Sequence, residues 1–390
     1  MATKFRFNYN NQTVDFDDYY VRSDIFTQGN LWSWGLNSSA QLADNSTTSR
    51  SSPVQSIDRG TNWRQVAGGY YSSYGIKTDG TLWCWGDGAA GKLGDNTTTS
   101  RSSPVQTVMG GTNWVQVASN GQFAAAIRSD GTLWLWGYNN KGQLGDNTVV
   151  SKSSPVQTVT YSADWKQVAC GYWHTAAIKT DGSLWCWGYN AYGTLGDNTS
   201  VTKSSPVQTI AGGSNWNSIA SNFYSNFAIK TDGTLWCWGY GYNGQNAINS
   251  TVNISSPIQT ITGGTNWKQV SCFGYNAGAI KTDGTLWMWG SNFYGELGDN
   301  TTVHRSSPVQ TVVGGNIWKQ VGCGGQSGNH TTGAIKTDGT LWLWGYGGNG
   351  NLGDNTVVSR SSPVQTIMGG NNWKQIAGAR QPMMAITYIN

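Results

Sequence analysis

A five-residue motif, Leu-Trp-x-Trp-Gly, recurs seven times along this chain of 390 residues. Its first Trp stands at positions 32, 83, 134, 185, 236, 287 and 342, so the spacing is 51 residues until the last interval, which is 55. A fixed period of this length indicates one supersecondary unit copied in series. The repeat therefore predicts one domain, although the length alone would allow two or three.

The composition indicates that the repeated unit is built from strands. The chain has 22 Trp, and Glu296 is its single Glu. Helix surfaces are usually rich in Glu, Lys, Ala and Leu, whereas Trp, Tyr, Thr and Val suit pleated strands. We therefore predict an all-β protein.

Each copy of the repeat contains four strand-like segments. In one copy these are Trp165–Ala169, Thr175–Lys179, Ser183–Trp187 and, opened by a Ser-Ser-Pro segment, Val207–Ile210. An Asp-Gly pair supplies the tight turn between the second and third segments, because it accommodates positive φ. Four short antiparallel strands per copy, repeated seven times, predict a β-propeller with seven blades.

The two ends of the chain complement each other. The N-terminal copy has only the third and fourth strands, Leu31–Trp34 and Val54–Ile57, and the C-terminal copy has only the first two, Trp373–Ala377 and Met384–Ile389. Together they make one whole blade, which closes the ring and removes exposed sheet edges. We therefore assign residues 29–390 to the propeller and residues 1–28 to an N-terminal arm.

The motif also predicts the core. Along a strand, Trp83 and Trp85 share one face while Leu82 and Cys84 share the other. Both faces of a propeller blade meet neighbouring blades, so we expect all fourteen Trp of the motif to be buried.

The arm matches nothing in the repeat. Phe5, Phe7 and Tyr9 alternate with polar residues, as in one edge strand, and acidic residues follow at Asp15, Asp17 and Asp18. Either the arm is a flexible leader, or it docks on a partner or on the propeller.

The bulk properties exclude several classes of partner. The net charge of +4 is small and is spread over repeat positions, whereas a nucleic-acid-binding domain carries a basic stripe. No apolar run is long enough to span a bilayer, and the N-terminus lacks the apolar core of a secretion signal. We expect no nucleic acid, no membrane insertion, and a protein made in a cytoplasm.

The polar residues do not form a catalytic or metal site. The six Cys occupy repeat positions that other copies fill with small or apolar residues, which is typical of core thiols. Asp95 and its equivalents in Leu-Gly-Asp-Asn-Thr bring one carboxylate and one amide per loop, far fewer oxygens than calcium needs, and we expect them to cap turns. The three His lie in different copies. We predict no enzyme activity, no cofactor and no metal.

The motif set resembles one known repeat family. Leu-Trp-x-Trp-Gly, Gly142–Gly145 (Gly-Gln-Leu-Gly), Ser-Pro-Val and Gly171–Thr175 (Gly-Tyr-Trp-His-Thr) are similar to the regulator of chromosome condensation repeat, from residue 29 to the end of the chain. The resemblance implies a seven-bladed propeller with repeats offset from blades. Family members include a guanine-nucleotide exchange factor for a small GTPase, ubiquitin-ligase modules and a bacterial protein inhibitor of β-lactamase. This chain lacks the exchange factor's inserted wedge; its one length change is four residues within 324–333.

Sequence variation between copies points to the loops as the functional part. The loops after the first strand and after Trp-Gly are rich in Tyr, Phe and Asn, which are common on adaptable recognition surfaces. Such rings either bind a partner or fill gaps between blades. The candidate binding residues are Tyr70, Tyr71, Tyr74, Phe123, Tyr172, Trp173, His174, Phe223, Tyr224, Phe273, Tyr275, His330 and Arg380.

These features favour a structural or recognition propeller. The expected partner is a protein, with a glycan as a second possibility because aromatic rings stack on sugars. Near-identical repeats rich in Asn, Thr and Ser, preceded by a short arm, look like proteins attached to tailed-bacteriophage particles. We therefore hypothesise a virion component that contacts a virion neighbour or a host surface protein. The alternatives are an exchange-factor-like regulator of a small GTPase and a stand-alone protein inhibitor or lectin.

Overall fold

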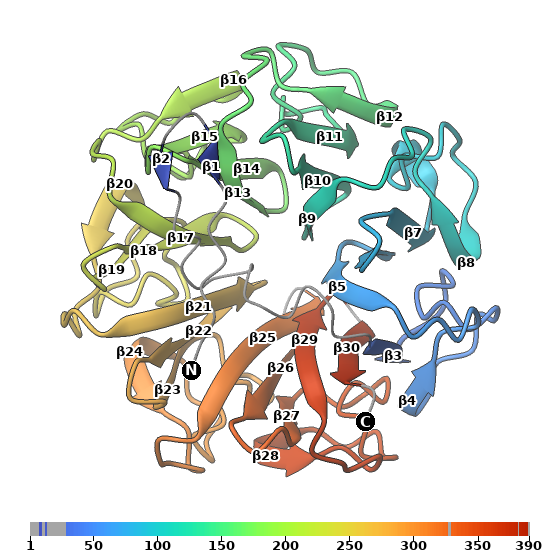
Figure 1. Cartoon of the computed structure of the whole chain (residues 1–390). Helices are drawn as coiled ribbons and strands as arrows, with labels where there is room; N and C mark the ends of the chain where they lie inside the picture. Colours follow the sequence, from blue (N-terminus) through green and yellow to red (C-terminus); the bar gives the residue numbers. More distant parts are fainter. Residues whose placement is uncertain (1–7, 10–11, 14–28, 327–328, 381, 389–390) are drawn as a thin grey trace.

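The computed structural model describes residues 8–9, 12–13, 29–326, 329–380 and 382–388. Within these residues the chain forms seven four-stranded antiparallel sheets arranged as the blades of a ring (Figure 1). The sequence therefore predicted the all-β class and the number of blades correctly. A short 3-10 turn, η1 (Ala89–Gly91), interrupts one loop.

In six blades the strands run from the centre of the ring to its rim in chain order, and in the seventh β29 and β30 precede β3 and β4 (Figure 1). The innermost strands are β5 (Trp63–Gly68), β9 (Trp114–Ser119), β13 (Trp165–Cys170), β17 (Trp216–Ser221), β21 (Trp267–Phe273), β25 (Trp318–Gln326) and β29 (Trp373–Gly378). The second strands are β6 (Ser72–Lys77), β10 (Phe123–Arg128), β14 (His174–Lys179), β18 (Ser225–Lys230), β22 (Asn276–Lys281), β26 (Asn329–Lys336) and β30 (Pro382–Tyr388). The third strands are β7 (Leu82–Gly86), β11 (Leu133–Gly137), β15 (Leu184–Gly188), β19 (Leu235–Gly239), β23 (Leu286–Gly290), β27 (Leu341–Gly345) and β3 (Gly29–Gly35). The outermost strands are β8 (Arg101–Gln106), β12 (Lys152–Gln157), β16 (Lys203–Gln208), β20 (Ile254–Gln259), β24 (Arg305–Gln310), β28 (Arg360–Gln365) and β4 (Arg50–Gln55).

The two ends of the chain form one composite blade, in the order β29-β30-β3-β4. Strand β3 pairs with β30 over seven residue pairs, among them Trp32 with Ala385. The predicted closure of the ring is thereby confirmed. Of the arm, β1 (Asn8–Tyr9) pairs with β2 (Gln12–Thr13), while Phe5, Phe7 and the acidic run at 15–18 lie outside the described residues.

The fourth strand of each blade was predicted at the wrong position. In the copy used above, β16 begins at Lys203 and ends at Gln208, whereas Val207–Ile210 was expected; Ile210 lies beyond the strand and is 58% exposed. A register shift between Cys186 and Gly188 lets Lys203 pair with Gly188, so the strand starts before the Pro. Proline is tolerated there because this is an edge strand.

The expectation that both Trp of the motif are core is wrong for the first one. Trp85 is fully buried, but Trp83 is half-buried. Its indole N–H donates to Thr81 Oγ1 (2.8 Å) beside the Asp-Gly turn, and Lys77 Nζ lies 4.4 Å from its ring centre. A different Trp completes the core: Trp63, at the start of β5, is fully buried and meets Trp85 edge to face, with ring centres 5.8 Å apart.

The second Trp of each motif joins its blade to the preceding one. Trp187 Nε1 donates to the backbone oxygen of Gln143 at 2.9 Å, and equivalent bonds occur in all seven blades. The acceptor lies in the Gly-x-Leu-Gly loop. There Gly145 has a φ of 68°, and a Cβ on it would lie 2.7 Å from Trp187 Nε1. The Gly-x-Leu-Gly loop therefore provides the surface against which the Trp of the next blade packs.

A second contact between blades lies around the channel. Gln116 on β9 accepts a hydrogen bond from the Val168 backbone N–H (3.0 Å) and donates to the Val168 carbonyl oxygen (2.9 Å). One primary amide thus continues the β-ladder from one blade into the next. The backbone N–H of the next inner strand donates to such a side chain at six Gln residues: Gln65, Gln116, Gln167, Gln269, Gln320 and Gln375.

Replacing Gln116 with Ser is expected to destabilise the protein by about 2 kcal/mol, because two buried backbone groups of Val168 lose their partner. Chemical denaturation followed by circular dichroism measures the change. Gln106→Ser, at an exposed position on β8, is the control and should have almost no effect. Equal effects of the two substitutions would contradict the bridging role.

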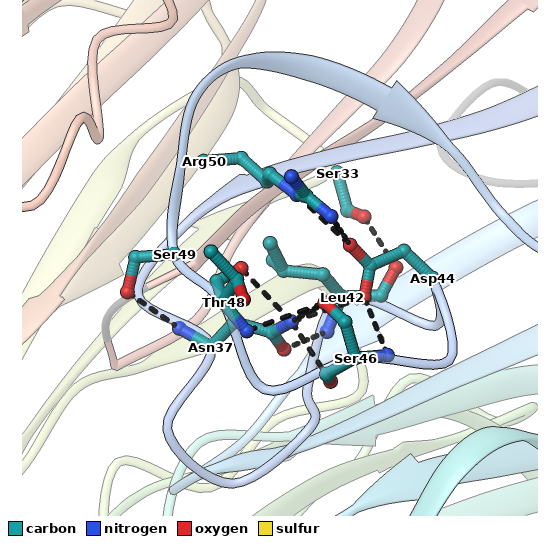
Figure 2. A network of polar contacts seen from close by, with 8 residues as sticks. All are labelled: Ser33, Asn37, Leu42, Asp44, Ser46, Thr48, Ser49 and Arg50. Atoms are coloured by element: carbon teal, nitrogen blue, oxygen red, sulfur yellow. Dashed lines mark hydrogen bonds and ion pairs between the residues drawn. The ribbon is translucent and has the colours of Figure 1, made fainter.

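A third contact lies at the rim, in the Leu-Gly-Asp-Asn-Thr loops and their counterparts. Asn45, with a φ of 58°, donates its backbone N–H to Ser102 O (3.0 Å) and accepts from Ser102 Oγ (2.9 Å) on the next blade. Within the same loop Asp44 accepts from the Ser46 N–H and pairs with Arg50, while Asn37 donates to Asp44 (Figure 2). The Asp residues therefore cap turns, as the sequence predicted, and the Asn residues also link neighbouring blades, which it did not predict.

The six Cys are buried free thiols, in agreement with the core role assigned to them. Burial raises their pKa; that of Cys323 rises to about 12. In the part of the chain that the structure describes, no group of His, Cys, Asp or Glu side chains could hold a metal ion, and no helix is long and apolar enough to cross a membrane.

Candidate recognition face

The loops that vary between copies gather around one mouth of the central channel. The seven innermost strands line the channel, and Phe273, the last residue of β21, is one of the lining residues. Loops after the first strand lie beside loops after Trp-Gly: the backbone N–H of Tyr189, for example, donates to Trp173 O (2.9 Å). Both sets of variable loops therefore share one face of the ring.

Aromatic side chains on this face form a continuous series that crosses several blades. Ring centres lie 5.6 Å apart for Tyr70 and Tyr172, and 5.1 Å apart for Tyr172 and Phe223. The series continues from Phe223 to Tyr275 (5.5 Å) and from Tyr275 to His330 (6.0 Å). At the other end the Arg380 guanidinium lies 3.4 Å from the centre of the Tyr70 ring. We call this set the aromatic crescent; with the adjoining rings it comprises Tyr70, Tyr71, Tyr172, Trp173, Phe223, Tyr224, Phe273, Tyr275, His330 and Arg380.

The crescent depends on contacts between blades that are not neighbours. Tyr70 and Tyr172 belong to the blades on either side of β9–β12, which contributes Gly121 at the equivalent loop position. A Cβ at Gly121 would lie 2.2 Å from Tyr172 O, and Gly121 O accepts the Tyr70 N–H (2.9 Å). Nearby, Asn120 Nδ2 donates to Ser221 O (2.9 Å), again past an intervening blade. The channel is therefore narrow at this mouth.

The loops after Trp-Gly enlarge the crescent with three tyrosines. Tyr189 contacts Trp173 at 5.5 Å between ring centres, and Tyr192 lies 5.3 Å from Tyr224 and 4.8 Å from Tyr240. The sequence placed these tyrosines in a variable loop but not among the candidate binding residues. The contacts of Tyr189 with Trp173 and of Tyr192 with Tyr224 depend on how the two loop sets meet in space, and the repeat pattern does not contain that information.

Four candidate residues are fully buried, so the prediction that they lie on the binding surface is corrected for Tyr74, Phe123, His174 and His330. Tyr74 and Phe123 lie on second strands, and their rings pack between blades; the Tyr74 hydroxyl donates to Lys92 O (2.8 Å). His174 Nε2 is 3.0 Å from Asn226 Oδ1, and burial lowers its pKa to about 4. Burial likewise lowers the pKa of His330, to about 3. Both imidazoles are therefore neutral at pH 7, and they pack in the interior beneath the partly exposed rings of this face.

Phe223 and Phe273 are also mostly buried, while Tyr70, Tyr71, Tyr172, Trp173, Tyr224 and Tyr275 are half-buried. The half-buried rings are the part of the crescent that a partner could touch. Burial raises the pKa of Tyr172, with hydrogen bonding to Gln122 acting the other way. The Tyr172 phenol therefore remains a neutral hydrogen-bond donor, and the face offers apolar ring area edged by hydroxyl groups.

The fold and this face define the class: a seven-bladed β-propeller built from Trp-rich repeats, with an aromatic face at one channel mouth. The family model described as "RCC1-like domain" matches residues 104–388, and the one described as "Regulator of chromosome condensation (RCC1) repeat" matches residues 28–76 and 79–127. The chain belongs to the RCC1-like domain family.

Relatives in this family differ in what they do. The "Ultraviolet-B receptor UVR8" of Arabidopsis thaliana is 27% identical over 351 residues, covering 85% of this chain and 76% of the relative. The human "E3 ubiquitin-protein ligase HERC2" is 27% identical over 362 residues; the match covers 90% of this chain but 7% of that protein.

Solved structures agree on the fold. The structure of Prp20p from Saccharomyces cerevisiae, whose title mentions "Its Binding Properties to Gsp1p and Histones", aligns with a TM-score of 0.81 at 18% identity and covers 94% of this chain and 93% of that one. Human WBSCR16 aligns with a TM-score of 0.78 at 20% identity, covering 92% of this chain and 99% of that one. At these identities the likeness shows the fold alone.

Proposed function

We propose that this propeller is a non-enzymatic recognition module that binds a protein partner through the aromatic crescent. The observation that carries the proposal is the run of half-buried Tyr and Trp rings across several blades at one face. Tyr and Trp supply large contact area at low cost in side-chain entropy, which is why they are enriched at the centres of interfaces. Residues that repeat in every blade are used for closure of the ring, and the crescent is built from residues that do not repeat.

The test is a substitution at the centre of the crescent. Replacing Tyr172 and Trp173 with Ala should weaken partner binding at least ten-fold, because central aromatic anchors each contribute about 2 kcal/mol or more. Purified wild-type and variant proteins, immobilised at equal density, would be compared for partner capture by surface plasmon resonance. A glycan array run with the same proteins separates a sugar ligand from a protein.

The matched control is Tyr161→Ala. Tyr161 is 74% exposed and lies in the connection from β12 to β13, at the opposite end of the blade from the crescent. Its replacement should leave capture unchanged. If the control loses as much binding as the double variant, the crescent is not the recognition surface.

A regulator of a small GTPase is the second candidate. It is favoured by the fold likeness to Prp20p, whose title names Gsp1p as a binding partner. In place of a wedge insertion, the present chain has the longer β25–β26 hairpin, in which Gln326 pairs with Asn329. A nucleotide-release assay with small GTPases from the source organism decides between the candidates: acceleration above the intrinsic rate would favour the regulator.

A narrower form of the main proposal places the propeller on a tailed-bacteriophage particle, in contact with a virion neighbour or a host surface protein. It is supported by the near identity of the repeats and their Asn, Thr and Ser content. Electron microscopy of the source particle should then show the ring in symmetry-related copies. Recovery of the protein only as a free pool would reject this narrower form and leave the recognition function standing.

A further inference from the structure

One cation on the aromatic face, Arg380, has no anionic partner among the residues that the structure describes. Arg380 follows β29 and occupies the loop position that Tyr70 and Tyr172 hold in their own blades. Its side chain is 9% exposed. The guanidinium lies 3.4 Å from the centre of the Tyr70 ring and 4.8 Å from that of Tyr71. Stacking on these rings fixes the plane of the guanidinium at one end of the crescent.

Two nitrogen atoms of Arg380 are left without acceptors in the part of the chain that the structure describes. Nε and Nη1 are buried and have no hydrogen-bond partner among the residues that the structure describes. By contrast, Arg101 binds Asp95 through two nitrogen atoms (2.8 and 2.9 Å), and Arg64 donates to Trp114 O (2.8 Å). Burying a cation without a partner costs several kcal/mol. Arg380 is therefore the charged group of this face that would gain most from an incoming anion.

Backbone contacts with both adjacent blades hold the loop that carries Arg380 in place. Its backbone N–H donates to Gly69 O (3.2 Å), and Gly325 N donates to Ala379 O (2.7 Å), so both adjacent blades fix this loop. Lys92 also lies near Tyr70, with Nζ 5.9 Å from the ring centre, but it is paired with Asp87. The charge of Lys92 is thus already balanced, whereas no described residue balances that of Arg380.

We propose that Arg380, stacked on Tyr70 and Tyr71, is a carboxylate-binding site at the edge of the crescent. The planar fork of a guanidinium matches the two oxygens of a carboxylate, and such bidentate pairs are strong when partly buried. In a partner segment with an acidic side chain next to an aromatic or apolar one, the carboxylate would bind the Arg380 guanidinium. The neighbouring side chain would pack against the adjoining rings. The inference rests on the proposed recognition function and names the charge of the residue that is recognised.

Two sources could supply the carboxylate: a partner protein, or the chain's own arm with Asp15, Asp17 and Asp18. The probe is a fluorescein-labelled peptide of residues 13–21, Thr-Val-Asp-Phe-Asp-Asp-Tyr-Tyr-Val, with a second peptide in which the three Asp are Asn. Binding to the full-length protein is measured by fluorescence anisotropy. We expect the acidic peptide to bind at least ten-fold more tightly than the Asn peptide, and Arg380→Gln to abolish that preference.

Control variants separate charge from folding. Arg59→Gln removes the same charge from an exposed loop at the opposite face and should keep the preference. Arg380→Lys keeps the cation without the fork and should retain only part of it, while circular dichroism checks that each variant is folded. Equal affinity of the two peptides for the wild-type protein, or an unchanged preference in Arg380→Gln, would overturn the site.

The same experiment distinguishes the two sources. In a full-length protein with Asp15→Asn, Asp17→Asn and Asp18→Asn, tighter binding of the acidic peptide shows that the arm competes for the site. Unchanged affinity supports a carboxylate from another molecule. If Tyr172→Ala with Trp173→Ala abolishes partner capture but Arg380→Gln leaves the peptide preference intact, the recognition function stands and the carboxylate site is rejected.

Discussion

Replacing Trp85 with Ala should destabilise the protein by about 3 to 5 kcal/mol, the usual cost of truncating a fully buried Trp. Trp85 has no exposed surface, packs edge to face on Trp63, and donates its indole N–H to Gln41 O at 2.9 Å. The substitution leaves a cavity between two blades and removes one of two donors to Gln41 O, the other being Ser73 Oγ at 3.1 Å. Urea denaturation followed by far-UV circular dichroism measures the loss.

Trp83→Ala is the matched control, since it removes the same side chain from the same strand two residues earlier. Trp83 is half-buried, and its indole bonds within its own blade to Thr81. We expect a smaller loss, about 1 to 2 kcal/mol, because part of the ring is already exposed to solvent in the folded protein. Equal losses of stability for the two variants would contradict the conclusion that the buried contact of Trp85 between blades stabilises the ring.

Replacing Glu296 with Gln should stabilise the protein at pH 8 by up to about 3 kcal/mol and leave it nearly unchanged at pH 4. Glu296 is fully buried in the loop between β23 and β24, and burial raises its pKa to about 7 from an ordinary value of 4.5. The folded state keeps its proton up to a higher pH than the unfolded state does. Stability is therefore greatest below pH 4.5 and is lost as the pH rises toward 7.

The repeat itself supplies the control for Glu296. Gln245 occupies the equivalent position and accepts the Asn243 N–H at 2.8 Å, while Glu296 accepts the Tyr294 N–H at 2.9 Å. Gln245→Glu should therefore introduce a second loss of stability over the same pH range. Denaturation curves of the three proteins at pH 4, 6 and 8 provide the comparison; a pH-independent effect of Glu296→Gln would contradict the assignment.

The repeat period and the complementary chain ends were sufficient to predict the blades and the closure, because strand pairing follows directly from where Leu31 and Trp373 begin their half-blades. The sequence did not reveal which Trp of each motif is buried. Alternation along a strand places Trp83 and Trp85 on one face. It does not show that Trp83 lies at the end of the blade that carries the Asp-Gly turn, where its ring is beside Lys77 and partly exposed. The Gln bridges were missed for a related reason: a Gln in a strand normally faces solvent, and only the curvature of the ring brings Gln116 against the next backbone.

The aromatic character of the face was predicted, and its geometry was not. Tyr74 and Phe123 belong to second strands and turn inward, whereas Tyr189 and Tyr192 reach the crescent from a different loop. The contact between Tyr70 and Tyr172 depends on Gly121, an absent side chain in the blade between them. A comparison of copies shows which positions vary, but not which of them meet across the channel.

The composite blade also sets an order of events during synthesis. Strand β3 pairs with β30, and the Trp32 indole bonds to Thr387, 355 residues later. At about 5 to 20 residues per second, a ribosome needs roughly 20 to 70 s to make the intervening chain. Throughout that time β3 and β4 have no inner strands to pair with, although six complete blades can form behind them. The ring thus becomes a closed body only after its last strand leaves the ribosome.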